Sequence, residues 1–155
     1  MMLNKLSISI THLQKAVYQL HLAEHLLEVT YPLIKDPKML LSVLSNLEQS
    51  HENLLESVLP SNLIKADTSF MSKLNSFEDL LQSQIVLSEG EIKTIKTVHD
   101  LVDQHKESAV VFSRKDSFII CEDDYKMQKI DPLLVGEQIH NTKKLTTKIF
   151  GLVEK

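Results

Sequence analysis

Two pairs of residues have the spacing that metal-binding helical bundles use, Glu48/His51 and Glu137/His140. Each pair has the form Glu-x-x-His, which places both side chains on one face of a helix. Ferritin-like bundles combine two such pairs with one glutamate from each of two further helices. Glu24 could supply one of the additional glutamates. The spacing therefore raises the hypothesis of a ferritin-like, metal-binding bundle.

The expected geometry of the helices argues against this hypothesis. If the first two helices form an antiparallel hairpin, Glu48 lies level with Gln19, and His51 with Ala16. Glu24 would then lie roughly 8–12 Å away along the helix axis, too far to share a metal ion with them. We therefore expect all the Glu-x-x-His side chains to be solvated or to flank the core, and we expect no cofactor.

Glu24 and His51 each fall on the apolar face of a predicted helix, which is unusual for these residue types. One interpretation is that each lies at the edge of that face and extends its polar end to water. The other is a polar cleft between helices that perturbs the pKa of a glutamate or a histidine. His21 and His25, four residues apart, could hold a metal ion jointly. A solvated helix face is the simpler interpretation of that second pair.

Arg114 is the only arginine among 17 basic residues. It precedes Lys115 and Asp116 at the tip of a predicted β-hairpin. One hypothesis is that Arg114 and Lys115 contact an anion or a phosphate, with Ser113 and Tyr125 as hydrogen-bond partners. The alternative is an ion pair within the turn, from Arg114 to Asp116, or one to a carboxylate of the bundle.

Nucleophilic and phosphate-loop chemistry have little support in the sequence. Cys121 follows Ile120 and precedes Glu122, and both apolar burial and a neighbouring acid raise the pKa of a thiol. No GxSxG or HExxH motif is present, and three scattered glycines do not make a glycine-rich phosphate loop. The sequence therefore gives no catalytic set, and we expect a protein that is not an enzyme.

Apolar residues at helical spacing predict five helices. Asp36-Pro37 and Asp131-Pro132 are helix-start signals, because aspartate caps a helix and proline suits its first position. Ser88 and Glu91 have the spacing of a capping box. Thr30 should end the first helix, because Pro32 disfavours a helical conformation at the residue before it. The predicted helices span about 10–30, 37–59, 67–85, 88–108 and 132–152.

The segment of about 110–121 differs from the rest of the chain, because it alternates between short apolar runs and a polar turn. This pattern predicts a β-hairpin. An isolated hairpin is marginal in water, so it should pack on the helices. The expected fold is mostly α: an up-and-down bundle of about five helices, with a short hairpin before the last helix, in a single domain of residues 1–155.

Composition limits the classes of function. A net charge of −4 argues against a nucleic-acid binder that depends on a strong positive field, although a local basic patch remains compatible with it. One cysteine cannot form an internal disulfide bond, which fits a reducing cytosol. No signal-peptide pattern is present, and no apolar run approaches the ~18 residues of a membrane span. We expect a cytoplasmic protein with no membrane partner.

The segments HLAEHLLEVTYPLIKDPKMLLSVLSNLEQSHENLLESVL and FSRKDSFIICEDDYK resemble small uncharacterised helical proteins of reduced-genome archaea. The helix pattern is also similar to HEPN-type bundles, which are often dimeric and sometimes cleave RNA. Active HEPN members carry an arginine followed four to six residues later by a histidine. Here the histidine after Arg114 is His140, so the resemblance implies a HEPN-like bundle without that catalytic motif.

Three hypotheses for function follow. The leading one is a non-enzymatic interaction or scaffold module that self-associates or binds a protein partner, because the leucine faces are long and no catalytic set is present. The second is a HEPN-like RNA or nucleotide binder that uses Arg114, Lys115 and Tyr125. The third is the metal-binding bundle built on the Glu-x-x-His pairs.

Overall fold

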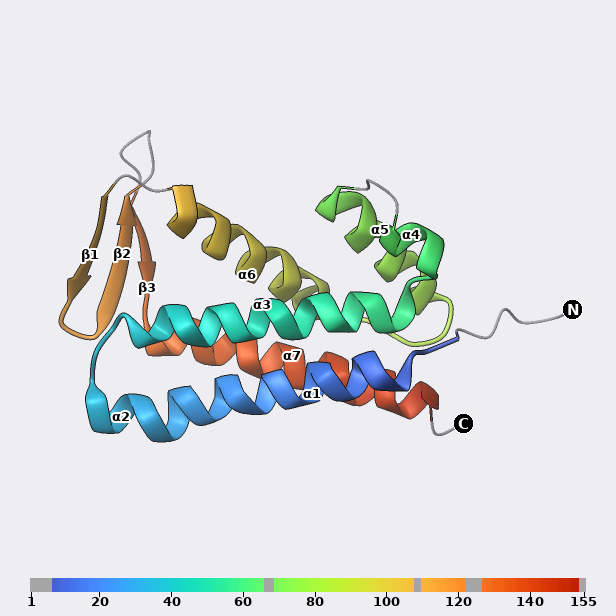
Figure 1. Cartoon of the computed structure of the whole chain (residues 1–155), viewed down its shortest axis with the longest axis horizontal. Coiled ribbons are helices and arrows are strands. Elements are labelled where there is room, and N and C mark those ends of the chain that lie inside the picture. Colours follow the sequence, from blue (N-terminus) through green and yellow to red (C-terminus); the bar gives the residue numbers. More distant parts are fainter. Residues whose placement is uncertain (1–6, 66–68, 108–109, 122–126, 154–155) are drawn as a thin grey trace, which may run out of the picture.

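The chain is mostly helical, with a small antiparallel sheet before the last helix, as its sequence predicts (Figure 1). The structure, a computed structural model, describes residues 7–65, 69–107, 110–121 and 127–153. The helices are α1 (Ile10–His25), the π-helical turn η1 (Leu26–Thr30), α2 (Tyr31–Ile34), α3 (Met39–Val58), α4 (Ser61–Lys65), α5 (Phe70–Gln82), α6 (Glu89–Glu107) and α7 (Pro132–Val153). The strands are β1 (Val110–Arg114), β2 (Ser117–Cys121) and β3 (Met127–Ile130).

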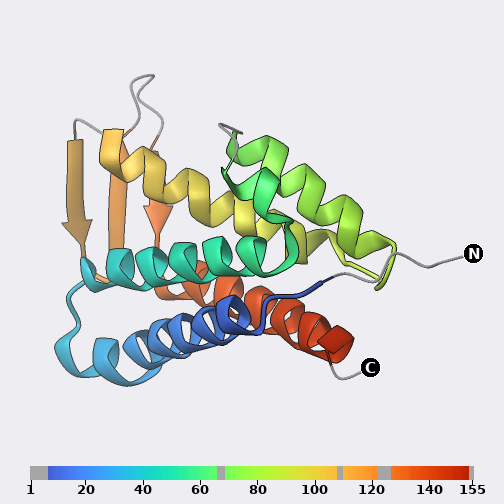
Figure 2. The ribbon, with the colours of Figure 1, turned by 45° about the vertical axis from the view of Figure 1, so that its right-hand side comes forward.

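The helices α1 and α3 form an antiparallel pair, and α7 runs alongside them (Figure 2). Ser50 Oγ on α3 donates a hydrogen bond to the Ala16 carbonyl on α1 at 2.7 Å. Gln19 Nε2 donates to Gln49 Oε1 at 3.2 Å. These contacts confirm the expected alignment of the two helices to within about one residue. The sheet lies at the α2 end of this pair, whereas α4 and α5 lie toward the other end (Figure 1).

The start signal predicted for α7 is confirmed, whereas α3 begins at Met39, two residues later than its Asp36-Pro37 signal predicts. Asp36 Oδ1 accepts a hydrogen bond from the Lys38 amide at 3.0 Å just before α3, and Asp131 Oδ1 accepts one from the Leu134 amide at 2.8 Å at the start of α7. The capping role predicted for Glu91 at the start of α6 is wrong. Glu91 is fully buried, and its Oε1 is bound at 2.6 Å by Lys148 Nζ of α7. Its carboxylate joins two helices instead of capping one.

The first helix does not end at Thr30 as predicted. Tyr31 adopts a helical conformation (φ −58°, ψ −46°) although proline follows it. The preceding turn is π-helical, and the Tyr31 amide donates to the carbonyl of Leu26, five residues earlier. This wider turn changes the position of the carbonyls next to the Pro32 ring, so the helix continues through the proline. Tyr31 therefore lies within a continuous helical segment, and its side chain is buried.

The predicted hairpin is present, and β3 adds a third strand that the sequence did not predict. β1 pairs with β2 so that Arg114 lies opposite Ser117, and β3 pairs with the other edge of β2. Phe118 and Ile120 of the central strand are buried in the same cluster as Leu101 of α6. The hairpin is stabilised by pairing with the third strand and by packing on the end of the bundle, because two strands alone are marginally stable in water.

Two buried apolar clusters fill the molecule, one at the sheet end and one at the end of α4 and α5. On α3, Leu47 belongs to the first cluster and Leu54 to the second. Each fully buried leucine contributes about 2 kcal/mol through burial. Between the two leucines lie Ser50 and His51, both buried and both hydrogen-bonded to other helices. A buried polar layer therefore separates the clusters along α3.

Candidate functional site

A pocket of about 970 Å³ lies at the sheet end, between the β1–β2 turn, α2 and the first turn of α7. Part of its wall is apolar and includes Ile119 and Leu133. The charged residues that line it are Lys35, Arg114, Lys115, Asp116, Lys129 and Asp131. Four basic side chains thus face two carboxylates, and the pocket carries an excess of positive charge. Such a wall suits a ligand with an anionic group and an apolar part.

The phenol of Tyr31 is the buried polar group of this pocket. Its side chain is 9% exposed, and its hydroxyl has no hydrogen-bond partner in the described part of the chain. Burial raises the pKa of the Tyr31 phenol, and the charges of Asp116 and Asp36 raise it further. The hydroxyl therefore keeps its proton at neutral pH and can donate a hydrogen bond. A buried donor without an acceptor is rare in proteins, so it is an informative feature of a pocket wall.

Backbone strain is concentrated at the same pocket. Lys35 (φ 56°) and Lys115 (φ 47°) have a left-handed backbone, and no other non-glycine residue in the described ranges has a positive φ. Lys35 follows α2, and Lys115 begins the two-residue turn between β1 and β2. Glycine or asparagine would adopt these conformations with less strain. Because strained backbone often marks functional sites, two lysines at such positions point to a use for their side chains.

The structure confirms that Arg114 and Lys115 lie at the hairpin tip. The expected ion pair from Arg114 to Asp116 is not formed, and Arg114, Lys115 and Lys35 have no ion-pair partner in the part of the chain that is described. Lys129 differs, because its Nζ lies 3.9 Å from Asp131 Oδ2. Tyr125, the third residue that we assigned to this site, lies outside the described residues. Sequence reasoning missed Tyr31 and Lys35, which belong to α2 and its C-terminal cap, and Lys129 of β3.

The Glu-x-x-His pairs do not form one cluster. Glu137 and His140 are exposed on α7 and line a separate surface pocket. His51 is buried, and Glu48 lies near His99 of α6 instead. The ferritin-like arrangement of these four residues is therefore absent from the structure.

Glu24 and His51 have different environments. Glu24 forms an ion pair with Lys143 of α7 and is partly exposed, as expected for a residue at the edge of an apolar face. His51 does not reach water: it is 2% exposed, and its Nε2 lies 2.8 Å from Thr142 Oγ1. Burial lowers the pKa of His51 to about 3. The expectation that its polar end reaches solvent is wrong, and the histidine is neutral at physiological pH.

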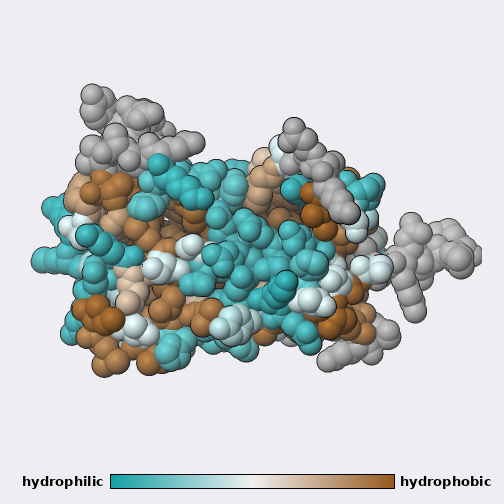
Figure 3. Space-filling view, in the orientation of Figure 1, coloured by the Kyte–Doolittle hydropathy of each residue, from teal (hydrophilic) through white to brown (hydrophobic). Residues whose placement is uncertain are grey.

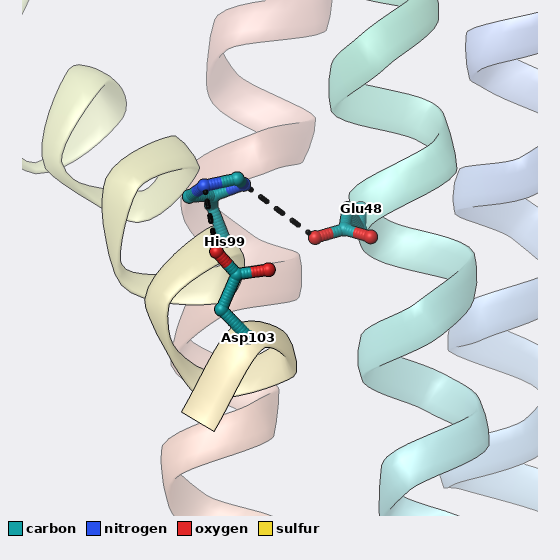
Figure 4. A group of neighbouring side chains, drawn as sticks. All are labelled: Glu48, His99 and Asp103. Carbon is teal, nitrogen blue, oxygen red and sulfur yellow. Dashed lines mark ion pairs between the residues drawn. The ribbon is translucent and has the colours of Figure 1, made fainter. Parts of the chain in front are cut away.

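A second group of ionisable side chains joins α3 and α6: Glu48, His99 and Asp103 (Figure 4). Nδ1 of His99 lies 3.7 Å from Glu48 Oε2, and its Nε2 lies 3.2 Å from Asp103 Oδ2. Phe70 of α5 stacks on the imidazole at a centroid distance of 3.7 Å. Burial raises the pKa of Glu48, as does the nearby Glu52. Sequence reasoning missed His99, although its spacing of four from Asp103 was a usable signal.

Comparison with known proteins gives no relative from which a function could be transferred. The chain matches no protein-family model, no curated protein and no solved structure. Among its described helices, none is both long enough and apolar enough to cross a membrane.

Proposed function

We propose that this protein is a non-catalytic binding domain for a small ligand with a phosphate group and an apolar body, held in the pocket between α2, the β1–β2 turn and α7. The observation that carries the proposal is Tyr31, which lines this pocket and whose buried hydroxyl has no acceptor among the described residues. Three cationic side chains of the same pocket have no ion-pair partner in the described chain: Lys35, Arg114 and Lys115. A phosphate oxygen would satisfy the Tyr31 donor.

Charge and geometry support a phosphate as the anionic group. The guanidinium of Arg114 can form two parallel hydrogen bonds with phosphate oxygens, a geometry that lysine does not offer. Lys115 adds positive charge from the same turn, and Lys35 adds it from the end of α2. The apolar wall at Ile119 and Leu133 provides a surface for the body of the ligand. A phosphate alone would leave that wall unused.

The proposal is tested by calorimetric titration with three probes: phenyl phosphate, inorganic phosphate and phenol. We expect phenyl phosphate to bind at one site per chain and to bind more tightly than either of the other two. Arg114→Gln should weaken its binding by about tenfold or more, because a charge-assisted hydrogen-bond pair is worth about 1.5–3 kcal/mol. Raising the salt concentration should weaken binding in the wild type.

Lys96→Gln is the matched control, because Lys96 is exposed on α6 and pairs with Asp100 away from the pocket. Its titration should equal that of the wild type. Equal affinities of Arg114→Gln and the wild type for phenyl phosphate would remove the proposal. The RNA hypothesis for Arg114 and Lys115 is tested with the same variants and a short single-stranded RNA. Tighter binding of RNA than of phenyl phosphate would favour it.

Self-association is a second candidate function, and exposed apolar side chains favour it. Leu33 (81% exposed), Ile34 (56%) and Val29 (48%) lie at the η1–α2 end, and Leu133 (76%) lies in the first turn of α7. Figure 3 shows apolar residues gathered on this end of the molecule. Exposed apolar side chains that are grouped often mark a protein–protein contact.

Light scattering coupled to size-exclusion chromatography tests this candidate. We expect a dimer for the wild type and a monomer for Leu33→Lys. Val86→Lys is the control, because Val86 is exposed to a similar extent (86%) but lies in the connection between α5 and α6. A monomeric wild type at high concentration would argue against self-association.

A further inference from the structure

The group formed by Glu48, His99 and Asp103 lies outside the pocket, and the proposed function does not use it (Figure 4). One potential ligand atom from each of the three residues lies within 4.8 Å of the other two. Both nitrogens of the His99 ring face a carboxylate, Glu48 on one side and Asp103 on the other. The three side chains converge across the contact between α3 and α6.

The distances show which kind of cation fits between them. Asp103 is close enough to accept the Nε2 hydrogen of a neutral His99, and the Nδ1 lone pair then points at the Glu48 carboxylate. Two acceptors facing each other repel unless a cation lies between them. Their 3.7 Å separation is longer than a normal hydrogen bond of about 2.7–3.2 Å. Two ligands that each lie ~2.1 Å from one metal ion are roughly 3.4–3.7 Å apart.

We propose that Glu48 and Nδ1 of His99 bind a first-row divalent cation of the Zn²⁺ type, and that Asp103 holds the imidazole in the required tautomer by accepting its Nε2 hydrogen. Imidazole and carboxylate groups are ligands that Zn²⁺ accepts, and two protein ligands leave coordination positions for water or for substrate atoms. A carboxylate that binds the second nitrogen of a ligating histidine fixes the ring and strengthens the metal site. The open positions reach solvent, because the side chains of His99 and Glu48 are 28% and 17% exposed.

The surroundings of the site favour a bound cation. The ring of Phe70 lies parallel to that of His99, with 6° between their planes, and fixes the imidazole without covering its edge. Glu52 and Lys106 are the other charged groups near Glu48, and Glu52 offsets the positive charge of Lys106. With Glu48 and Asp103 themselves, the carboxylates outnumber the cationic groups at this point of the surface.

The test is a calorimetric titration of the full chain with Zn²⁺ after removal of metals by a chelator, followed by visible absorption with Co²⁺ as the substitute ion. We expect one Zn²⁺ per chain and a Co²⁺ spectrum of low coordination number. His99→Asn should weaken Zn²⁺ binding about 100-fold, and Asp103→Asn should weaken it about tenfold or more. Circular dichroism checks that each variant is folded. If His99→Asn does not fold, Asp103→Asn still tests the site, because it replaces an exposed side chain.

Two controls separate this site from other ligands on the surface. His25→Asn removes half of the His21/His25 pair, and Asp100→Asn removes a carboxylate that pairs with Lys96 on the same helix. Both variants should bind Zn²⁺ as the wild type does. The proposal is overturned if no saturable binding of one ion per chain occurs, if His99→Asn binds as tightly as the wild type, or if His25→Asn abolishes binding.

Discussion

The imidazole of His51 on α3 and the hydroxyl of Thr142 on α7 form a buried hydrogen bond of 2.8 Å between residues 91 positions apart. Thr142 Oγ1 also lies 2.7 Å from the carbonyl of Gln138, to which it donates its only proton. His51 Nε2 must therefore be the donor to Thr142, and its Nδ1 is a lone-pair acceptor without a partner in the described chain. The polar layer of the core depends on a neutral histidine of one tautomer.

The burial of His51 predicts that stability falls as the pH is lowered. The unfolded chain binds a proton at His51 below about pH 6.5, whereas the folded chain, with a pKa of about 3, does not. The free energy of unfolding should therefore decrease by about 1.4 kcal/mol per pH unit between pH 6.5 and pH 3 from this group alone. Urea denaturation at pH 7 and pH 5 measures the loss, expected to be about 2 kcal/mol.

The contribution of His51 is isolated by comparison with His51→Gln, since glutamine can donate the same bond to Thr142 without titrating. This variant should lose about 2 kcal/mol less than the wild type between pH 7 and pH 5. His140→Gln, a change on the exposed face of α7, should lose as much as the wild type. Identical pH profiles for the wild type and His51→Gln would contradict the assignment.

Removal of the Thr142 hydroxyl tests the hydrogen bond itself. Thr142→Val keeps the shape of the side chain but leaves the Nε2–H of His51 without an acceptor, which should cost about 1–3 kcal/mol of unfolding free energy. Thr147→Val is the control, because Thr147 also donates to the carbonyl four residues earlier but is exposed. Its effect should be within about 0.5 kcal/mol. If both variants lost the same free energy of unfolding, the buried hydrogen bond between His51 and Thr142 would not stabilise the protein more than an exposed one.

The elements of this fold are encoded locally, and most of them were predictable for that reason. Aspartate before proline marks the start of α7 and the turn before α3, and short apolar runs on either side of a polar turn produce β1 and β2. The errors occur where packing overrides local preference. Tyr31 is helical before Pro32 because the preceding π-helical turn accommodates the proline ring. Glu91 pairs with Lys148 and does not cap its own helix, because α6 and α7 pack together.

The candidate sites were predictable only in part. Arg114 and Lys115 were identified because a hairpin turn is a local feature, but Tyr31 joins them only through the packing of α2 against the sheet end. Similarly, Glu48 was singled out for its spacing to His51, whereas its neighbour in space is His99, from a helix that follows two others. Spacing along one helix does not show which residues of another helix lie opposite it.

The ion pair between the buried Glu91 and the partly exposed Lys148 predicts an asymmetric response to mutation. Lys148→Met leaves the fully buried carboxylate without its cation, which should destabilise the protein by about 3–5 kcal/mol. The double variant Glu91→Gln/Lys148→Met should recover a large part of this loss. The control, Lys96→Met, breaks an exposed pair with Asp100 and should cost about 0.5 kcal/mol or less. Thermal and urea denaturation measure all three, and a small effect of Lys148→Met would contradict the prediction.

Tyr31→Phe separates stability from binding. The change removes a buried hydroxyl that has no partner among the described residues, so the free energy of unfolding should stay the same or rise by about 1 kcal/mol. The affinity for phenyl phosphate should fall, because the ligand loses a hydrogen bond. Tyr18→Phe, on an exposed side chain of α1, should change neither property. A clear loss of stability in Tyr31→Phe would show instead that the hydroxyl has a structural partner.

Replacing either lysine that has a left-handed backbone should raise the stability of the protein and weaken ligand binding. Lys115→Gly and Lys35→Gly remove the strain of a side chain at positive φ, so each should raise the free energy of unfolding by about 1 kcal/mol. Each should also weaken the binding of phenyl phosphate, because a cation is lost from the pocket. Lys93→Gly is the matched control: Lys93 is exposed inside α6, and glycine in the interior of a helix should destabilise the protein by about 0.5–1 kcal/mol. Denaturation and calorimetry on the three variants measure both effects. The prediction fails if either glycine at positive φ destabilises the fold as the control does, or if both leave the affinity for the ligand unchanged.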